Sequence, residues 1–288
     1  MVQLWLHHFD FISMKLTDQL LSDLWLEEMG WNSPDRKSRK FDDSLEEAFW
    51  EKAAPHYAET NNLNNDTPLI AKTILDFVGR NHRILEIGPG SGNFTVRLSP
   101  FAGEILAVEP SAAMRQALKK NLAAFNVSHV TVIPKKWEEA EGVKADYVVS
   151  VNSLYRVRDI RSALEKMIAC ASRGVIIVRT VQRPFFFEIL SKLGIPAEEC
   201  KDHLLIPLFL AVLGYKADVS YLHYRAKRNF SSLEEAYRLA SAEAGEREIS
   251  ESDFYQSIQK YSHEIPSGIR LSQARVTAVI TVRKGELP

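Results

Sequence analysis

The chain is poor in cysteine, has no long hydrophobic run and carries no excess of charge of either sign. Its two cysteines, Cys170 and Cys200, are too few for a disulfide framework, so we expect a reducing, cytoplasmic location. The formal net charge of −1 gives no electrostatic drive for sequence-independent binding to nucleic acid. The longest apolar run, Leu204 to Leu213, is about half of a membrane span and contains Pro207, so we expect no membrane association.

The amino-terminal part, residues 1–78, is expected to form a helical extension or lid. Its first thirteen residues lack the basic start and the apolar stretch of a signal peptide, and Met14 is an alternative start. TDQLLSDLWLEEMG has helical spacing and ends on Gly30, a typical helix stop. SLEEAFWEKAAPHY is predicted to be a second helix, with Ser44 as cap and Glu47 completing a capping box.

Strand and helix patterns alternate in residues 79–183. The predicted strands are short apolar runs suited to burial on both faces: RILEI, EILAVE, VTVI, DYVVSV and GVIIVRT. Helical patterns lie between them at Asn93–Ser99, Ser111–Phe125 and Ile160–Ser172. This alternation predicts an α/β fold, a doubly wound and mostly parallel sheet with helices on both faces.

Residues 184–288 are expected to supply helical insertions on the substrate side and the last two strands of a seven-stranded sheet. We expect the segment 184–270, together with the amino-terminal helices, to roof the pocket and set specificity. Those strands are ADVSYLHYRA and ARVTAVITVRK, and the helices between them are LEEAYRLASAEAG and ESDFYQSIQKYS. The run Phe185 to Phe187 and the segment LLIPLFLAVLG line a hydrophobic pocket or, as the favoured reading, belong to a core or subunit contact.

A glycine-rich turn follows the first predicted strand. Gly88, Gly90 and Gly92 stand between a strand and a helix, where a doubly wound sheet binds its ligands. About 20 residues further on, Glu109 ends the next strand, where a carboxylate can bind both hydroxyls of a ribose. The turn and the acid together predict an adenosine-containing ligand.

Glu86 distinguishes between two such ligands. A pyrophosphate at the following helix would meet this carboxylate as a like charge, at a cost of about 1–4 kcal/mol at short range. The third glycine also arrives one residue too early for the dinucleotide fingerprint G-x-G-x-x-G, which disfavours a NAD-dependent dehydrogenase. The ammonium and sulfonium of S-adenosylmethionine would instead be attracted, so we expect S-adenosylmethionine as the cofactor.

These motifs resemble those of class I S-adenosylmethionine-dependent methyltransferases, which have a Rossmann-like fold. The stretch Glu86 to Gly92 is similar to the family's first motif, and AVEPSAAM, with Glu109 and Pro110, to the second. DYVVSVNSLYRVRD and FWEKAAPHYAE resemble segments of the type 11 group, which includes quinone-biosynthesis and many small-molecule methyltransferases. The resemblance implies that Glu109 binds the ribose and that Met114 lies beside the adenine.

The adenine contact departs from the family pattern. Members often place an aspartate after the third strand, whereas this chain has Pro134-Lys-Lys-Trp137-Glu138. Glu138 or a nearby backbone carbonyl is the expected acceptor for the adenine amino group, and Trp137 is expected to lie against the purine.

The acceptor side is expected after the fourth strand, near Asn152 and Tyr155. Asn-Ser-Leu-Tyr faintly resembles the N-P-P-Y motif but lacks both prolines, so a wall or packing role for Tyr155 is favoured. Tyr57 either folds over the methionine end of the cofactor or is a core aromatic. If the acceptor needs a general base, the candidates in order are Tyr155, His56 and His223.

Cys200 and His203 have the spacing C-x-x-H but no second pair nearby. Tetrahedral zinc takes four ligands, so we expect no metal site.

We therefore expect in-line methyl transfer to a small, partly apolar metabolite by an enzyme that binds no nucleic acid. A homodimer is a candidate assembly. One alternative is methylation of transfer RNA or protein, against which the neutral charge stands. Another is a non-catalytic protein that binds S-adenosylmethionine.

Overall fold

The computed structural model describes residues 18–32, 38–61, 66–182, 185–195, 199–244 and 247–285, without the side chains of 55–61 and 66. The α-helices are α2 (Asp18–Glu28), α3 (Asp43–Asn61), α4 (Asp66–Val78), α5 (Asn93–Leu98), α6 (Ala112–Ala124), α7 (Ile160–Cys170), α8 (Phe187–Lys192), α9 (Asp202–Val212), α10 (Leu233–Ala244) and α11 (Glu251–Ile258). The strands are β1 (Arg83–Ile87), β2 (Glu104–Val108), β3 (Val130–Ile133), β4 (Ala145–Val151), β5 (Ala171–Thr180), β6 (Asp218–Phe230), β7 (Ser262–Ile265) and β8 (Gly268–Arg283).

The strands form one mixed sheet in the order β3-β2-β1-β4-β5-β8-β6, with β7 paired to β8. Strands β1 to β5 pair in parallel, whereas β8 runs antiparallel to both β5 and β6. The predicted doubly wound, mostly parallel sheet is therefore confirmed. Among the described residues β7 is an additional strand, because the predicted helix 251–262 ends at Ile258 and Ser262 already belongs to a hairpin with β8.

Alternate residues of the central strands face two separate cores. Ile84 and Ile105 pack with α4 and α5 on one face, while Leu85 and Leu106 pack with α7 on the other. The strands are apolar at nearly every position because both faces are covered by helices. Because β1 to β5 run parallel, their carboxyl ends all lie at one edge of the sheet, where folds of this kind bind their ligands.

Of the amino-terminal helices, α2 packs against α9 and α7. α2 inserts the fully buried Trp25, whose indole N–H donates to the Val157 carbonyl over 2.8 Å. α3 packs against α6. The predicted capping box at Ser44 is wrong: Asp42 Oδ1 accepts the N–H groups of Ser44 and Leu45 at 2.8 and 3.2 Å, and Glu47 reaches α6 instead. A carboxylate one residue before the helix competes better for these donors than the Ser44 hydroxyl inside it.

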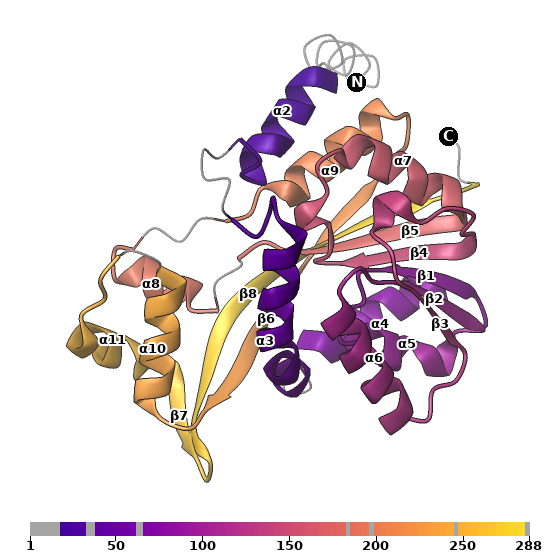
Figure 1. The fold of residues 1–288 in the computed structure, drawn as a ribbon. Helices are drawn as coiled ribbons and strands as arrows, with labels where there is room; N and C mark the ends of the chain where they lie inside the picture. The colour runs from indigo at the N-terminus through magenta and orange to yellow at the C-terminus, as the bar shows by residue number, and fades with distance from the viewer. Residues whose placement is uncertain are drawn as a thin grey trace, which may run out of the picture.

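Strands β6 and β8 run on past the parallel strands into a small unit formed with β7, α8, α10 and α11 (Figure 1). This unit has a core of its own, in which the rings of Phe186, Phe230 and Phe254 meet. Phe185 and Phe186 are buried there, so they are core residues, as favoured, and not pocket residues.

The apolar run in α9 is also core. Leu205, Ile206, Phe209 and Leu210 are buried in the same cluster as α2 and α7. Within the described part of the chain, no helix is both long enough and apolar enough to cross a membrane.

Candidate functional site

A cavity of about 1120 Å³ lies at the carboxyl ends of β1, β2 and β4. The predicted site residues that line it are Glu86, Gly88, Gly90, Glu109, Pro110, Met114, Trp137, Glu138, Asn152 and Tyr155. Gly92 does not line it, and the side chains of His56 and Tyr57 lie outside the described residues. The strand-turn-helix motifs therefore converge on one place.

Two glycines of the turn have different surroundings: Gly88 packs closely against Ser153, whereas Gly90 has free space beside it. All three glycines have positive φ, which disfavours any side chain. A Cβ on Gly88 would lie 2.4 Å from the Cβ of Ser153, so this glycine is required by the end of β4. A Cβ on Gly90 would meet nothing closer than the Met114 sulfur at 3.9 Å. The backbone at Gly90 is thus left accessible to a ligand.

Glu109 is held by backbone donors at the end of β2. Its Oε2 accepts the N–H of Gly90 at 2.9 Å, and its Oε1 accepts the N–H of Ser111 at 3.0 Å. The residue is only 6% exposed, and this burial raises the pKa of the carboxyl group, although the two N–H donors oppose the shift. The carboxylate ties the glycine turn to α6, and each oxygen retains a second lone pair for a ligand.

Glu86 is the more deeply buried of the two acids. Its Oε2 accepts the hydroxyl of Thr95 at 2.7 Å. Burial raises its pKa to about 7, and the charge of Glu109 adds to this, while the Thr95 hydrogen bond opposes it. A ligand with positive charge would lower the pKa of Glu86 again, because it stabilises the charged form of each carboxyl group and so opposes the effects of burial and of the Glu109 charge.

The wall expected for an adenine is formed by Met114 and Trp137. Met114 is buried in the first turn of α6, where its N–H donates to the Ser111 hydroxyl. Trp137 is fixed from behind: its indole N–H donates to the Ala163 carbonyl at 3.2 Å, and the Lys166 ammonium lies 4.6 Å from its ring. Glu138 is exposed at the rim.

Asn152 joins β4 to β5. It has a left-handed backbone with φ of 54°, and its side-chain amide donates to the Thr180 hydroxyl and accepts the Thr180 N–H. With both ends of its amide engaged, Asn152 performs no N-P-P-Y-like recognition in this geometry.

Tyr155 donates to a carboxylate that the sequence did not reveal as a site residue. Its hydroxyl lies 2.5 Å from Oε1 of Glu46 in α3. Burial first, then the hydrogen bond to Glu46, raise the pKa of this phenol above its usual value. Tyr155 therefore holds its proton, which opposes its predicted use as a general base; Glu46 is the acceptor of the pair.

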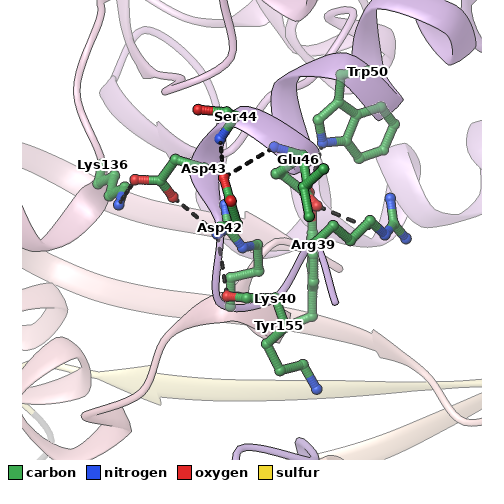
Figure 2. Close-up of polar contacts among 11 residues, drawn as sticks. Arg39, Lys40, Asp42, Asp43, Ser44, Glu46, Trp50, Lys136 and Tyr155 are labelled. Atoms are coloured by element: carbon green, nitrogen blue, oxygen red, sulfur yellow. Dashed lines mark hydrogen bonds and ion pairs between the residues drawn. The ribbon is translucent and has the colours of Figure 1, made fainter. Parts of the chain in front are cut away.

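Three further contacts of α3, made by two of its acids, were missed. Asp43 forms ion pairs with Lys136 at 2.5 Å and Arg156 at 2.9 Å, and the Lys136 hydrogen bond is the main reason why its pKa is lowered (Figure 2). Glu47 Oε1 accepts the N–H of Ala113 at 2.8 Å. All of these residues lie far apart in the sequence, so only the i,i+4 spacing of Glu46 and Trp50 offered a local signal.

The other predicted candidates lie elsewhere. His223 is exposed on β6, and His203 Nδ1 lies 2.6 Å from the carbonyl oxygen of Cys200. Between residues 184 and 270, none of the described residues lines the cavity. The expectation that this segment roofs the pocket is therefore wrong for its described part; α3 and the turn before it cover the cavity.

A family described as "Methyltransferase domain" matches residues 56–244. An uncharacterized protein of Haemophilus influenzae is 29% identical over 143 residues, 48% of this chain and 52% of that protein. A tRNA/tmRNA (uracil-C(5))-methyltransferase of Azoarcus is 45% identical over 56 residues, 19% of this chain and 15% of that protein. The chain thus spans about half or less of the length of these relatives.

Solved structures with a similar fold include YcgJ of Bacillus subtilis, with a TM-score of 0.49 and 13% identity over 75% of this chain and 98% of that one. Magnesium protoporphyrin IX methyltransferase of Synechocystis, solved with bound SAH, has a TM-score of 0.44 and 11% identity over 74% and 80%. Because the family match covers more than half of the chain, the protein belongs to the methyltransferase-domain family.

Proposed function

We propose that the enzyme methylates a small, partly apolar metabolite bound in the cavity beside the cofactor. The observation that carries this proposal is the size and lining of the cavity. Its volume of about 1120 Å³ exceeds that of typical single-ligand pockets, and beyond the glycine turn it is lined by Trp31, Phe41 and Trp50. Two adjacent small ligands fit such a space better than an extended polymer does.

The residues at the glycine turn suit the cofactor. Two buried carboxyl groups, on Glu86 and Glu109, match a ligand with positive charge, and the open backbone at Gly90 lets it approach closely. We assign the ribose to Glu109 and the adenine side to Pro110, Met114, Trp137 and Glu138. S-adenosylmethionine supplies a methyl group already activated by its sulfonium.

Little further chemistry is required of the chain. Direct displacement on carbon needs the acceptor held in line and water kept out. α3 serves both needs, because the pairs of Asp43 with Lys136 and Arg156 hold its first turn over the edge of the sheet. Roles for His56 and Tyr57 in this helix stay proposals.

The test is a methylation assay on a panel of small hydroxyl- and amine-bearing aromatic metabolites, with detection of S-adenosylhomocysteine. The proposal expects turnover of at least one compound. S-adenosylmethionine binding without product from any compound, together with turnover of bulk RNA or protein, would replace this substrate class with a macromolecular one.

Methylation of transfer RNA is the second candidate, favoured by the local similarity to the Azoarcus enzyme. That similarity covers 15% of the relative, so most of that protein lies outside the match. Binding of transfer RNA that weakens steeply with salt would support this candidate.

The finer expectations from the sequence remain proposals. They are membership of the type 11 group, a cytoplasmic location, a homodimer as a candidate assembly, and division of the chain at residues 78 and 183. Cys170 and Cys200 are buried and form no disulfide with each other, which supports a reducing compartment.

A further inference from the structure

Glu46 is a buried carboxylate inside the cavity, on the first turns of α3. It is 6% exposed and lines the cavity together with Trp50 and Tyr155. Its Oε1 accepts two hydrogen bonds, from the Tyr155 hydroxyl at 2.5 Å and from the Trp50 indole N–H at 2.8 Å. One carboxylate oxygen is therefore fully used, and its two donors fix the orientation of the group.

The second oxygen has no hydrogen bond within the described part of the chain. Oε2 of Glu46 is buried, and its neighbouring cation is Arg39, whose Nε lies 3.7 Å away, too far for a hydrogen bond (Figure 2). The Arg39 guanidinium lies 3.6 Å from the centre of the Phe49 ring, and its side chain is 44% exposed. A buried carboxylate oxygen without a donor is costly, and such groups concentrate at functional sites.

The surroundings of Glu46 are aromatic. Trp31, Phe41, Trp50 and Tyr155 all line the cavity, and the rings of Trp31 and Phe41 meet edge to face at 5.3 Å. Aromatic side chains pack favourably against a planar ring. The cofactor acids Glu86 and Glu109 stand at the ends of β1 and β2, so Glu46 belongs to another part of the same cavity.

We propose that Glu46 anchors the methyl acceptor, with Oε2 accepting a hydrogen bond from an O–H or N–H group on a planar ring. This inference rests on the proposed function and specifies its substrate class. A hydroxyl or amine donor supplies what Oε2 lacks, whereas an ether offers only lone pairs and a carboxylate adds a like charge. The acceptor atom is thereby bound before methylation. When its bond to the methyl group forms and the methyl–sulfur bond of the cofactor breaks, the acceptor proton passes to Oε2 of Glu46 and from there to solvent, so a methylated hydroxyl no longer donates to Oε2 and the product is released.

The probes are phenol and its O-methyl product anisole, which share one ring and differ in the hydrogen-bond donor. Binding of S-adenosylhomocysteine is measured first by calorimetry, and each probe is then titrated into the binary complex. We expect phenol to bind about tenfold more tightly than anisole, because one hydrogen bond to a charged group is worth at least this factor.

Three variants isolate the carboxylate. Glu46→Gln replaces Oε2 by a donor or leaves a neutral acceptor, so the preference for phenol should fall to within about twofold while cofactor binding is retained. Glu51→Gln makes the same charge change on the exposed side of α3 and should leave the preference intact. Tyr155→Phe keeps the carboxylate but removes one of the two donors that orient it, so the preference should fall less than in Glu46→Gln. Circular dichroism verifies that each variant is folded.

The outcomes separate the two levels of the proposal. Wild-type protein that does not bind S-adenosylhomocysteine would overturn the proposed function itself. If it binds S-adenosylhomocysteine but not phenol, or binds phenol and anisole equally, the role of Glu46 is overturned while the proposed function stands. A preference for phenol that survives in folded Glu46→Gln also overturns that role.

Discussion

In the proposed cofactor site, single residues at the glycine turn supply the negative charge that would attract a cationic ligand. Glu86 is the sharpest case, because its raised pKa of about 7 means that near neutral pH the group is only partly ionised without a ligand. A cationic ligand favours the carboxylate form, so binding releases a proton and affinity must rise with pH.

We predict that the association constant for S-adenosylmethionine rises about tenfold between pH 6 and pH 8, since the ionised fraction of a group with this pKa rises from about one tenth to nine tenths. Calorimetry across this range measures it. In Glu86→Gln the rise should shrink to the part that arises from Glu109. An affinity that falls with pH in the wild type would contradict the assigned charge of the ligand.

Two glycines of the turn should respond differently to the same substitution. Gly88→Ala places a Cβ against Ser153 at positive φ and should cost about 1–3 kcal/mol of folding free energy. Gly90→Ala meets no protein atom within ordinary contact distance except the Met114 sulfur, so it should cost less stability but weaken cofactor binding. Thermal unfolding and calorimetry on both variants check this; equal effects on both quantities would show that Gly90 does not face the ligand.

At the scale of elements, α3 lines the cavity, and the residue that caps its first turn was predicted incorrectly. Asp42 caps it, and the acids that follow point to other elements. The helix therefore connects the loops at the carboxyl edge of the sheet to α6 through these side-chain contacts.

We predict that Asp42→Ala destabilises the protein by about 1 kcal/mol, the usual cost of losing a helix cap. Ser44→Ala is the matched control and should change stability by a few tenths at most, because its hydroxyl is not the cap. Urea unfolding of both variants decides between them. The reverse order of effects would restore the capping box at Ser44.

The elements and the residues of the glycine turn that line the cavity were predictable because their signals are local. Gly88, Glu86 and Glu109 lie on one strand-turn-helix-strand stretch, whose apolar runs and glycines specify the turn. Glu46 could not be found in this way, because its partner Tyr155 is 109 residues away. Asn152 was assigned to the ligand from its place after β4, whereas its amide is used by Thr180, a contact that depends on the register of β4 and β5.

In the whole molecule, the cavity lies at the parallel strands, whereas the unit formed by the ends of β6 and β8 with β7, α8, α10 and α11 lies apart from it. That unit has its own aromatic core, and none of its members in that core lines the cavity. Stability and cofactor binding should consequently be separable.

Phe254→Ala is predicted to cost about 3–5 kcal/mol, because the ring is fully buried against Phe186 and Tyr237. The affinity for S-adenosylmethionine of the folded variant should stay within about twofold of the wild type. Denaturant unfolding and calorimetry measure the two quantities. A large loss of affinity would show that this unit contributes to the cofactor site.

The most direct test of the central claim, that two buried acids at the carboxyl ends of β1 and β2 hold a positively charged nucleoside, is calorimetry with S-adenosylmethionine and NADH in parallel. We predict binding of S-adenosylmethionine alone, weakened by about 1–3 kcal/mol in Glu109→Ala through the loss of charged hydrogen bonds. Binding of NADH and not S-adenosylmethionine, or an unchanged affinity in that variant, would contradict the account.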